Sequence, residues 1–421
     1  MTAREVARRV LDRVQTGSAW ATLALDGELA RAGLEERDRR LAAEIVYGVL
    51  RHRMRLDRAL GAHADLRRTP PRVLTALRVS AYQLLFLDRV PGYAAVDDAV
   101  AATRAVAGAK LAGFCNAVLR KLATAKEPPL PPEGRARLEL EHSMPAWIVD
   151  ELVAIDPDAA AARAAALNQP APLVGRANAL RTTRDELVAQ LVAAGATAEP
   201  VEGLPMAIRF DGLGDPARSP SFQAGLWTVQ DPGAQRVGEL AAPRDGQRIL
   251  DACAGVGGKS THLAELAGDR VPIDAADQSR TKLGLLAETT ARLGITSVHP
   301  IVCDLTDPAA PLAAHYDLIV LDAPCSGLGV LRRHPDAKWR VKPDDVPRVA
   351  IVQRKLLDAV VARLAPGGAL VYSVCTFTRA EGPDQIRALL ARHPELALVA
   401  EERTWPPDGD AFYLARVVRS A

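Results

Sequence analysis

The stretch DACAGVGGKSTHLAEL, residues 251–266, places closely spaced glycines between a short apolar run and a run with helical spacing. A strand, a glycine-rich turn and a helix in this order open the α/β folds that bind nucleotides. A phosphate-binding Walker loop needs a glycine, four further residues and then Gly-Lys-Ser/Thr, and Cys253 occupies the position of that first glycine. The dinucleotide pattern GxGxxG likewise fails at Ser260. The turn is therefore expected to hold a ligand other than a nucleoside triphosphate or a dinucleotide.

An acid follows at the position where ribose-binding carboxylates are found. Asp277 ends the next apolar run, close to the roughly 20-residue offset of such carboxylates. Amide groups at the start of a helix bind a carboxylate as readily as a phosphate. S-adenosylmethionine offers this combination: ribose hydroxyls for Asp277, a methionine carboxylate for the turn, and an adenine edge for Asp304 after the third run. For Asp304, capping of the following TDPAAP turn is an equal alternative.

Apolar and helical runs alternate from the glycine turn towards the C-terminus. The apolar runs are RILD, VPIDAAD, HPIVCD, YDLIVLDAP and GALVYSVCT, followed by LALVAE and FYLARVV. Their alternation with helical runs predicts a doubly wound, Rossmann-like parallel sheet, whose ligands lie at the carboxyl ends of the strands. We expect this domain to span residues 216–421.

The preceding part of the chain divides into three predicted regions. Apolar residues recur at helical spacing from residue 3 to 124, which predicts an all-helical domain over residues 1–126. KEPPLPPEG, residues 126–134, has the composition of a semi-rigid linker, which we place at 127–142. Residues 143–215 mix helical and strand signals and predict a small α+β subdomain. The fold class is therefore multidomain, with α and α/β parts.

Charge is distributed unevenly along the chain. Residues 1–126 hold 22 Lys and Arg against 13 Asp and Glu, a net charge of +9, whereas the whole chain carries +2. Such an excess indicates a polyanionic partner for the amino-terminal domain. A solvated basic helix face explains the same excess equally well. The densest patch consists of Arg51, Arg53, Arg55, Arg58, Arg67, Arg68 and Arg72.

Cysteine usage and hydropathy indicate a soluble, cytoplasmic protein. The five cysteines form no CxxC pair, which argues against a disulfide framework and a zinc site, so no metal is expected. No apolar run reaches the about 18 residues of a membrane span, and MTAREVARRVLDRV lacks the apolar centre of a signal peptide. We therefore expect no membrane association.

Two cysteines follow the fourth and fifth apolar runs. Cys325 comes after LIVLDAP, with Asp322 three residues before it, and Cys375 comes after ALVYSV. In a parallel sheet, both thiols then lie at the ligand-binding edge. Methylation of carbon 5 of a cytosine needs a nucleophile added to carbon 6, and a thiolate suits that covalent route. Asp322 is placed to hydrogen-bond the base. For either cysteine alone, a buried inert thiol is the commoner role.

Three motifs resemble those of RNA cytosine-5 methyltransferases of the RsmB/Fmu/Sun type, which modify small-subunit ribosomal RNA. They are the glycine turn of residues 251–266, LDAPCSGLGVLRRHPDAKW of residues 321–339 and LVYSVCTFTRAEG of residues 370–382. EIVYGVLRHRMRLD and GFCNAVLRKL are similar to the NusB-like helical domain of that family, and FQAGLWTVQDPGAQ is similar to its entry into the catalytic domain. The resemblance covers nearly the whole chain.

The resemblance implies roles for the motif residues. Cys375 is implied as the nucleophile, Cys325 as the thiol that aids product release, and Asp322 as the acid beside it. The loop of Arg332, Arg333 and His334 is implied to lie beside the RNA, with helix capping as the alternative. From the charge patch, Arg51, Arg53 and Arg55 are expected to contact RNA as well. Cofactor contacts are implied for Cys253, Ala254, Gly255, Val256, Gly257, Gly258, Lys259, Asp277, Asp304 and Asp322.

Two positions depart from the family pattern. The turn reads AGVGGK where the family usually has AAPGGK, so Gly255 adds backbone freedom and a lower cofactor affinity is expected. After Cys375 the family often has Glu-Glu-Asn, of which Glu381 alone is present.

Together, these patterns predict S-adenosylmethionine-dependent methylation of a cytidine carbon 5 in 16S ribosomal RNA, through a covalent adduct between cysteine and carbon 6. The RNA is expected to be held electrostatically, with the target base splayed out, and no obligate protein partner is inferred. Two alternatives stay open. One is a DNA cytosine-5 methyltransferase with Cys325 as the nucleophile. The other is a non-catalytic RNA-binding ribosome-assembly factor, for which the altered glycine turn is the support.

Overall fold

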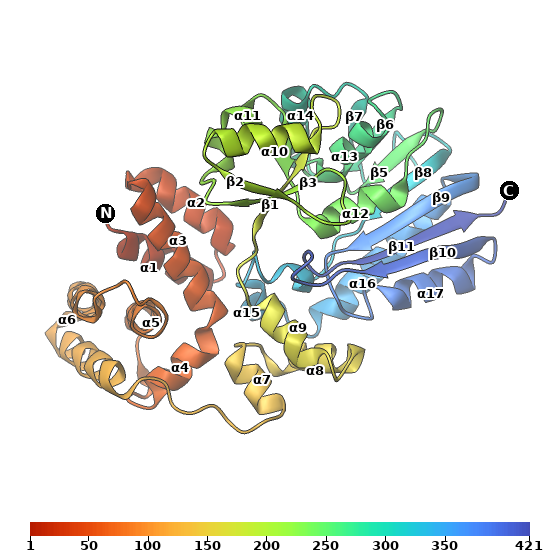
Figure 1. Ribbon diagram of the computed structural model, residues 1–421. Helices are drawn as coiled ribbons and strands as arrows, with labels where there is room; N and C mark the ends of the chain where they lie inside the picture. The colour runs from red at the N-terminus through yellow and green to blue at the C-terminus, as the bar shows by residue number, and fades with distance from the viewer. The chain divides into compact units, whose positions relative to one another are not determined.

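The computed structural model describes residues 1–421 and divides into two compact units. The first unit comprises Met1–Gln169 and Leu331–Val341, and the second comprises Pro170–Val330 and Lys342–Ala421. The first unit is helical, whereas the second contains two sheets and their covering helices (Figure 1). None of the helices combines the length and the apolar character that a membrane crossing requires.

The first unit is built from amphipathic helices around one apolar core. Val6, Ile45 and Leu77, which come from three different helices, are completely buried in this core. For residues 1–126, helical spacing predicted an all-helical fold, and this prediction is confirmed. The elements of the first unit are α1 (Ala3–Gln15), α2 (Ala21–Ala32), α3 (Glu36–Arg51), α4 (Arg53–Gly61), η1 (Leu66–Arg68), α5 (Pro71–Phe86), α6 (Gly92–Ala125), α7 (Arg135–Glu141), α8 (Ala146–Ile155), α9 (Ala160–Leu167) and α15 (Ala337–Arg340).

The proline-rich segment after α6 is held against α4. Arg55 donates two hydrogen bonds to the Glu127 carboxylate, at 2.8 and 2.5 Å, and Arg58 donates to the backbone oxygen of Pro128 at 3.0 Å. Helix α7 begins directly after this segment. The segment 127–142 is thus anchored by arginines at its start and helical near its end.

A four-stranded antiparallel sheet begins the second unit, in the order β2-β3-β1-β4. Trp227 of β4 is fully buried, with its ring 4.6 Å from that of Phe210 and 5.0 Å from that of Phe222. Strand β4 lies after residue 215, so this sheet draws on residues from both sides of that predicted boundary. Its elements are β1 (Leu173–Ala177), α10 (Arg184–Ala193), β2 (Thr197–Pro200), β3 (Ala207–Asp211), η2 (Pro216–Arg218), α11 (Pro220–Gln223) and β4 (Trp227–Val229).

The second sheet has seven strands in the order β10-β11-β9-β8-β5-β6-β7. Strands β9, β8, β5, β6 and β7 pair in parallel with one another, which confirms the Rossmann-like fold, and β11 pairs antiparallel with β9 at the end of this parallel set. Strands β10 and β11 pair antiparallel, because no helix crosses over between them. The elements are α12 (Pro232–Ala241), β5 (Ile249–Ala252), α13 (Gly258–Leu266), β6 (Ile273–Asp277), α14 (Arg280–Leu293), β7 (Val298–Val302), β8 (Tyr316–Asp322), η3 (Leu328–Val330), α16 (Asp345–Val361), β9 (Leu364–Val374), α17 (Pro383–Arg392), β10 (Leu396–Arg403) and β11 (Tyr413–Arg419).

Side chains of the central strands alternate between two apolar cores. Ile249 and Leu318 pack with residues of α12, α13 and α14, whereas Leu250 and Ile319 pack with residues of α16 and α17. Both faces of the sheet are therefore covered by helices, as in doubly wound folds. Because β5, β6, β8 and β9 run in the same direction, the loops that follow them gather at one edge.

Candidate active site

The glycine turn between β5 and α13 needs unusual backbone angles at several positions. Cys253, Gly255 and Gly257 have φ values of 68°, 57° and 87°. A Cβ at residue 257 would lie 2.6 Å from the side chain of Leu286, so only glycine fits there. The turn directs the amide groups that begin α13 towards the sheet edge, and the first amides of a helix have no acceptor within that helix.

Two predicted acids stabilise this edge through backbone contacts. Asp277 accepts hydrogen bonds from the amides of Gly255 at 2.9 Å and Ser279 at 2.7 Å, so it fixes the glycine turn from the end of β6. Asp304 accepts from the amide and hydroxyl of Thr306, at 2.8 and 2.7 Å, and these bonds hold its pKa below the usual value. These bonds agree with the alternative that Asp304 caps the turn that follows it. Asp304 also lines the cavity described next.

A cavity of 760 Å³ lies at this edge of the sheet, wholly within the second unit. Of the predicted cofactor residues, all but Gly257 line it, and Cys325 and Cys375 line it too. Its size falls in the range of small-molecule sites, about 300–1,000 Å³. The glycine turn, the acids after β6 and β7, and both cysteine loops thus border one space.

The two cysteine sulfurs lie 3.3 Å apart. Cys325 follows β8 and Cys375 follows β9, and the parallel pairing of these strands brings the two thiols together. The hydrogen bond with Cys375, together with burial, raises the pKa of Cys325 well above its usual value. Burial, followed by the charges of Asp277 and Asp322, raises the pKa of Cys253 to about 12, so that thiol stays protonated at neutral pH.

Asp322 pairs with a lysine of the glycine turn. Its Oδ2 lies 2.5 Å from the Nζ of Lys259, and its Oδ1 accepts a hydrogen bond from the Ser373 hydroxyl at 2.8 Å. Burial lowers the pKa of Lys259, but the charge and hydrogen bond of Asp322, together with the charges of Asp251 and Cys375, outweigh this effect and the pKa lies above its usual value. The carboxyl group of Asp322, with Lys259 as its fixed cation, therefore stands beside the cysteine pair.

Glu381 joins the two cysteine loops, a role that sequence reasoning missed. It is completely buried and accepts hydrogen bonds from the amide and hydroxyl of Ser326, both at 2.6 Å. The hydroxyl of Thr378 donates to it at 2.7 Å. Ser326 directly follows Cys325, so Glu381 fixes the loop after β8 from the loop after β9. The survival of this acid in the motif was the available signal.

Arg176 of β1 supports the glycine turn from the four-stranded sheet, and no sequence pattern indicated it. Its guanidinium is fully buried and donates to the Glu265 carboxylate at 2.7 and 2.8 Å. It also donates to the backbone oxygen of Gly258 at 3.2 Å and to the Thr261 hydroxyl at 3.1 Å. The first turns of α13 are therefore tied to β1.

The arginines predicted to contact RNA differ in their surroundings. Arg51 is 7% exposed and donates to the backbone oxygen of Arg332 at 3.1 Å, and Arg332 is itself 6% exposed. Arg55 is engaged by the carboxylate after α6, as described above. Burial therefore speaks against Arg51 and Arg332 as phosphate ligands, whereas Arg53 lines a pocket of the first unit.

The segment Leu331–Val341 belongs to the helical unit although it follows the Cys325 motif in the chain. The Thr22 hydroxyl lies 3.3 Å from Nδ1 of His334, and Asp336 accepts a hydrogen bond from the Ala21 amide at 2.9 Å. Lys338 is 1% exposed and donates to three oxygens of the same unit. The loop that carries Arg333 and His334 is thus embedded in helices, and its RNA contacts stay a prediction.

Comparisons with known proteins match the whole chain. The NusB family matches residues 1–124, the RsmF/B-like ferredoxin-like domain matches residues 144–215, and 16S rRNA methyltransferase RsmB/F matches residues 239–414. The probable ribosomal RNA small subunit methyltransferase B of Synechocystis sp. is 35% identical over 407 residues, covering 94% of this chain and 90% of that protein. The crystal structure of PH0851 has a TM-score of 0.83 at 23% identity and covers 98% of both chains. That of NSun6 from Pyrococcus horikoshii with SFG has a TM-score of 0.61 at 19% identity, covering 66% of this chain and 98% of that chain.

Proposed function

Because the chain belongs to the 16S rRNA methyltransferase RsmB/F family, with S-adenosylmethionine as its cofactor, we propose that it methylates carbon 5 of a cytidine in small-subunit ribosomal RNA. The observation that carries the proposal is the 3.3 Å separation of the Cys325 and Cys375 sulfurs beside the cavity. Two thiols so close can both reach one pyrimidine ring. An rRNA substrate also accords with a cytoplasmic protein.

The residues at the sheet edge fit the cofactor. Amides at the start of α13 suit its carboxylate, and Asp277 and Asp304 after β6 and β7 suit its ribose and adenine. Both oxygens of Asp277 already accept one backbone amide, and each keeps a lone pair for a ribose hydroxyl. When bound, the cofactor supplies an electrophilic methyl group. The positive φ of Gly255 supports the view that the turn tolerates its unusual AGVGGK sequence.

In the proposed reaction, the Cys375 thiolate forms a bond with carbon 6 of the cytosine, and the electrons of the 5,6 double bond move to carbon 5. Carbon 5 then takes the methyl group, and the electrons of the broken carbon–sulfur bond leave with the demethylated cofactor. Bonding of Cys375 to carbon 6 removes the hydrogen bond and charge that raise the pKa of Cys325, so Cys325 can release its proton to solvent. The Cys325 sulfur then takes the remaining proton from carbon 5, the electrons of that carbon–hydrogen bond re-form the double bond, and the Cys375–carbon 6 bond breaks to return the Cys375 thiolate. Asp322, held by Lys259 and Ser373, hydrogen-bonds the polar edge of the base and stabilises charge as it develops.

The test compares Cys375→Ala with Cys325→Ala, using methyl transfer to a 16S rRNA transcript. Cys375→Ala should abolish methylation without an adduct, whereas Cys325→Ala should trap a covalent protein–RNA complex visible on a denaturing gel. An adduct in Cys375→Ala would reverse the assignment of the nucleophile. Bisulfite sequencing of rRNA from cells with and without the gene then identifies the cytidine.

Two other functions make different predictions. A DNA cytosine-5 methyltransferase would use Cys325 as the nucleophile and would methylate duplex DNA under the same conditions. A non-catalytic assembly factor would bind RNA but show no S-adenosylmethionine binding in calorimetry at millimolar ligand. In our proposal and in the assembly-factor alternative, the helical domain proposed for residues 1–126 supplies electrostatic affinity for RNA.

A further inference from the structure

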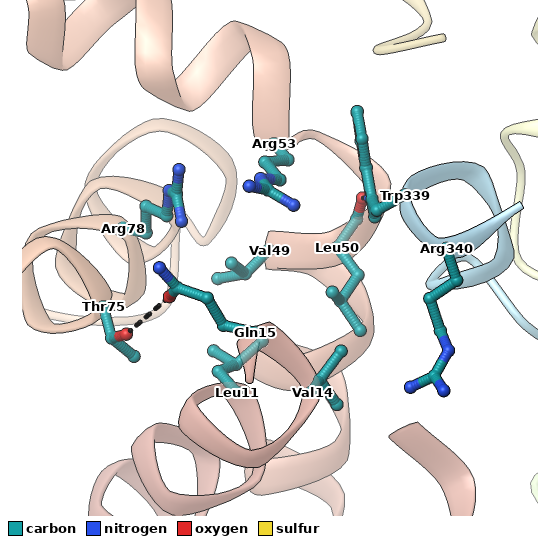
Figure 2. Close-up of a pocket in the computed structure, with 10 residues that line it drawn as sticks. All are labelled: Leu11, Val14, Gln15, Val49, Leu50, Arg53, Thr75, Arg78, Trp339 and Arg340. Carbon is teal, nitrogen blue, oxygen red and sulfur yellow. Dashed lines mark hydrogen bonds between the residues drawn. The ribbon is translucent and has the colours of Figure 1, made fainter. Parts of the chain in front are cut away.

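A second cavity, of 220 Å³, lies inside the first unit (Figure 2). At roughly 30 Å³ per water molecule, this volume equals about seven waters, which suits one phosphate or one base and excludes a duplex. The walls come from α1, α3, α4, α5 and α15. The lining residues are Leu11, Val14, Gln15, Val49, Leu50, Arg53, Thr75, Arg78, Trp339 and Arg340.

The pocket carries an excess of positive charge. Three arginines line it and no carboxylate does. Arg78 is neutralised by Asp57, to which it donates two hydrogen bonds at 2.7 and 2.8 Å. Arg340 donates to the backbone oxygen of Ala19, a neutral group. Arg53 and Arg340 therefore form no ion pair, and Asp57, the acid whose charge acts on Arg53, is shared with Arg78.

Arg53 is the least satisfied of these groups. Its guanidinium makes no hydrogen bond within the protein, and its close contact is with the Trp339 ring, whose centroid lies 5.1 Å from the guanidinium carbon. Burial lowers the pKa of Arg53. A half-buried guanidinium without an acceptor is unfavourable, so a ligand that supplies acceptor oxygens gains unusually strong, charge-assisted hydrogen bonds.

Neighbouring groups extend the donor set. The Thr75 hydroxyl donates to the Asp12 carboxylate at 2.7 Å, and the amide oxygen of Gln15 lies 3.4 Å from the same hydroxyl. The amide nitrogen of Gln15 makes no hydrogen bond and is available as a donor. Figure 2 shows Arg53 and Arg78 above the apolar side chains of Val49 and Leu11, with Gln15 beside Val49. Donors on one wall and an apolar floor on the other suit an anionic group attached to a planar or apolar one.

We propose that this pocket binds one unpaired nucleotide of the ribosomal RNA substrate, with its phosphate on Arg53. The proposal rests on the function proposed above, which supplies RNA as the polyanion. Unpaired RNA segments present both a phosphate and an exposed base, and arginine and aromatic side chains are their usual partners. The pocket thus identifies where the basic excess of the amino-terminal region acts on RNA.

The test measures binding of the full chain to a single-stranded RNA of 16S sequence by fluorescence anisotropy, at several salt concentrations. Arg53→Gln should weaken binding by about tenfold and lower the salt slope by about 0.7, the value for one phosphate contact on a single strand. Arg104→Gln removes an equal charge from an exposed site of the same unit, outside the basic patch, and should weaken binding by less than about twofold. Arg53→Lys should restore the salt slope.

Thermal melts of the variants check that the helical unit stays folded. Equal losses for Arg53→Gln and Arg104→Gln would show a diffuse charge effect and overturn the pocket. Competition by inorganic phosphate as effective as competition by RNA would show a free-anion site instead. If the unmodified chain methylates cytidine but Arg53→Gln binds RNA normally, the pocket proposal is refuted and the proposed function is not. If Arg53→Gln weakens RNA binding but the unmodified chain methylates no cytidine, the proposed function is refuted and the pocket proposal is not.

Discussion

The ion pair of Arg176 and Glu265 offers a quantitative test of how the glycine turn is supported. Arg176 is 0% exposed and Glu265 is 5% exposed, and two hydrogen bonds of 2.7 and 2.8 Å join them. Replacing Arg176 by methionine leaves the carboxylate buried without its cation. It also removes the donors to the backbone oxygen of Gly258 and to the Thr261 hydroxyl.

The expected loss of folding free energy is large because the ion pair no longer offsets the desolvation of the buried Glu265 carboxylate. Removing one partner of a buried pair costs about 3–5 kcal/mol, whereas replacing both partners by apolar residues is often neutral. For a unit of this size, 1 kcal/mol shifts the melting temperature by about 2–4 °C, so Arg176→Met should lower it by about 6–20 °C. The double variant Arg176→Met/Glu265→Leu should regain most of that loss.

The assay is thermal unfolding of the single and double variants, with cofactor affinity measured by calorimetry. Arg209→Met provides the matched control, because its pair with Glu199 is exposed and should contribute less than about 1 kcal/mol. Since Arg176 bonds to Gly258, its loss should weaken cofactor binding, whereas the loss of Arg209 should not. Similar melting temperatures for Arg176→Met and Arg209→Met, or no recovery in the double variant, would refute the reasoning.

Three further substitutions test other parts of the second unit. Gly238→Ala should destabilise the protein by about 1–3 kcal/mol in urea denaturation, because the new Cβ would lie 2.2 Å from Nδ1 of His262. Gly284→Ala, at an exposed helical site with open space around it, should instead stabilise by about 0.5–1 kcal/mol. Burial raises the pKa of Asp251 from 3.8 to about 7, so the native state holds a proton that the unfolded chain releases. The stability of the native sequence relative to Asp251→Asn should therefore fall as pH rises from about 4 to 7, measured by thermal melts across that window. Glu381→Gln should cost about 1.5–3 kcal/mol and slow methyl transfer, because charged hydrogen bonds that fix the loop after β8 become neutral; unchanged kinetics would contradict this role.

The secondary structure of this chain is readable from local patterns. The helices of the first unit and the strands β5, β6, β8 and β9 follow from apolar spacing, because each side chain's burial is set by the period of its own element. The antiparallel pairing of β10 with β11 was less accessible. It depends on the absence of a crossover helix between them, which is a feature of the connection and not of either strand.

In the candidate site, too, local motifs could be predicted from the sequence, whereas long-range contacts could not. Motif order predicted that Cys325 and Cys375 follow adjacent strands, and the 3.3 Å between their sulfurs agrees with that placement. Arg176 and Glu265 are 89 residues apart, and neither local sequence indicates that the two side chains pair. Long-range partners of this kind are chosen by packing, so local patterns cannot identify them. The domain boundaries and the roles of the site residues stay predictions.

The net charge of a domain does not show which of its charged side chains are free to bind a ligand. The excess of +9 over residues 1–126 treats all arginines as equivalent. In the structure, Arg55 is bound by a carboxylate and Arg51 is buried against a backbone oxygen, so neither presents a free cation. Arg53, two residues from each, has no internal acceptor and opens into a cavity. The capacity to bind a polyanion therefore depends on which guanidinium groups the fold leaves unsatisfied. The salt slope of Arg53→Gln therefore measures the capacity of the domain to bind a polyanion, and its net charge does not.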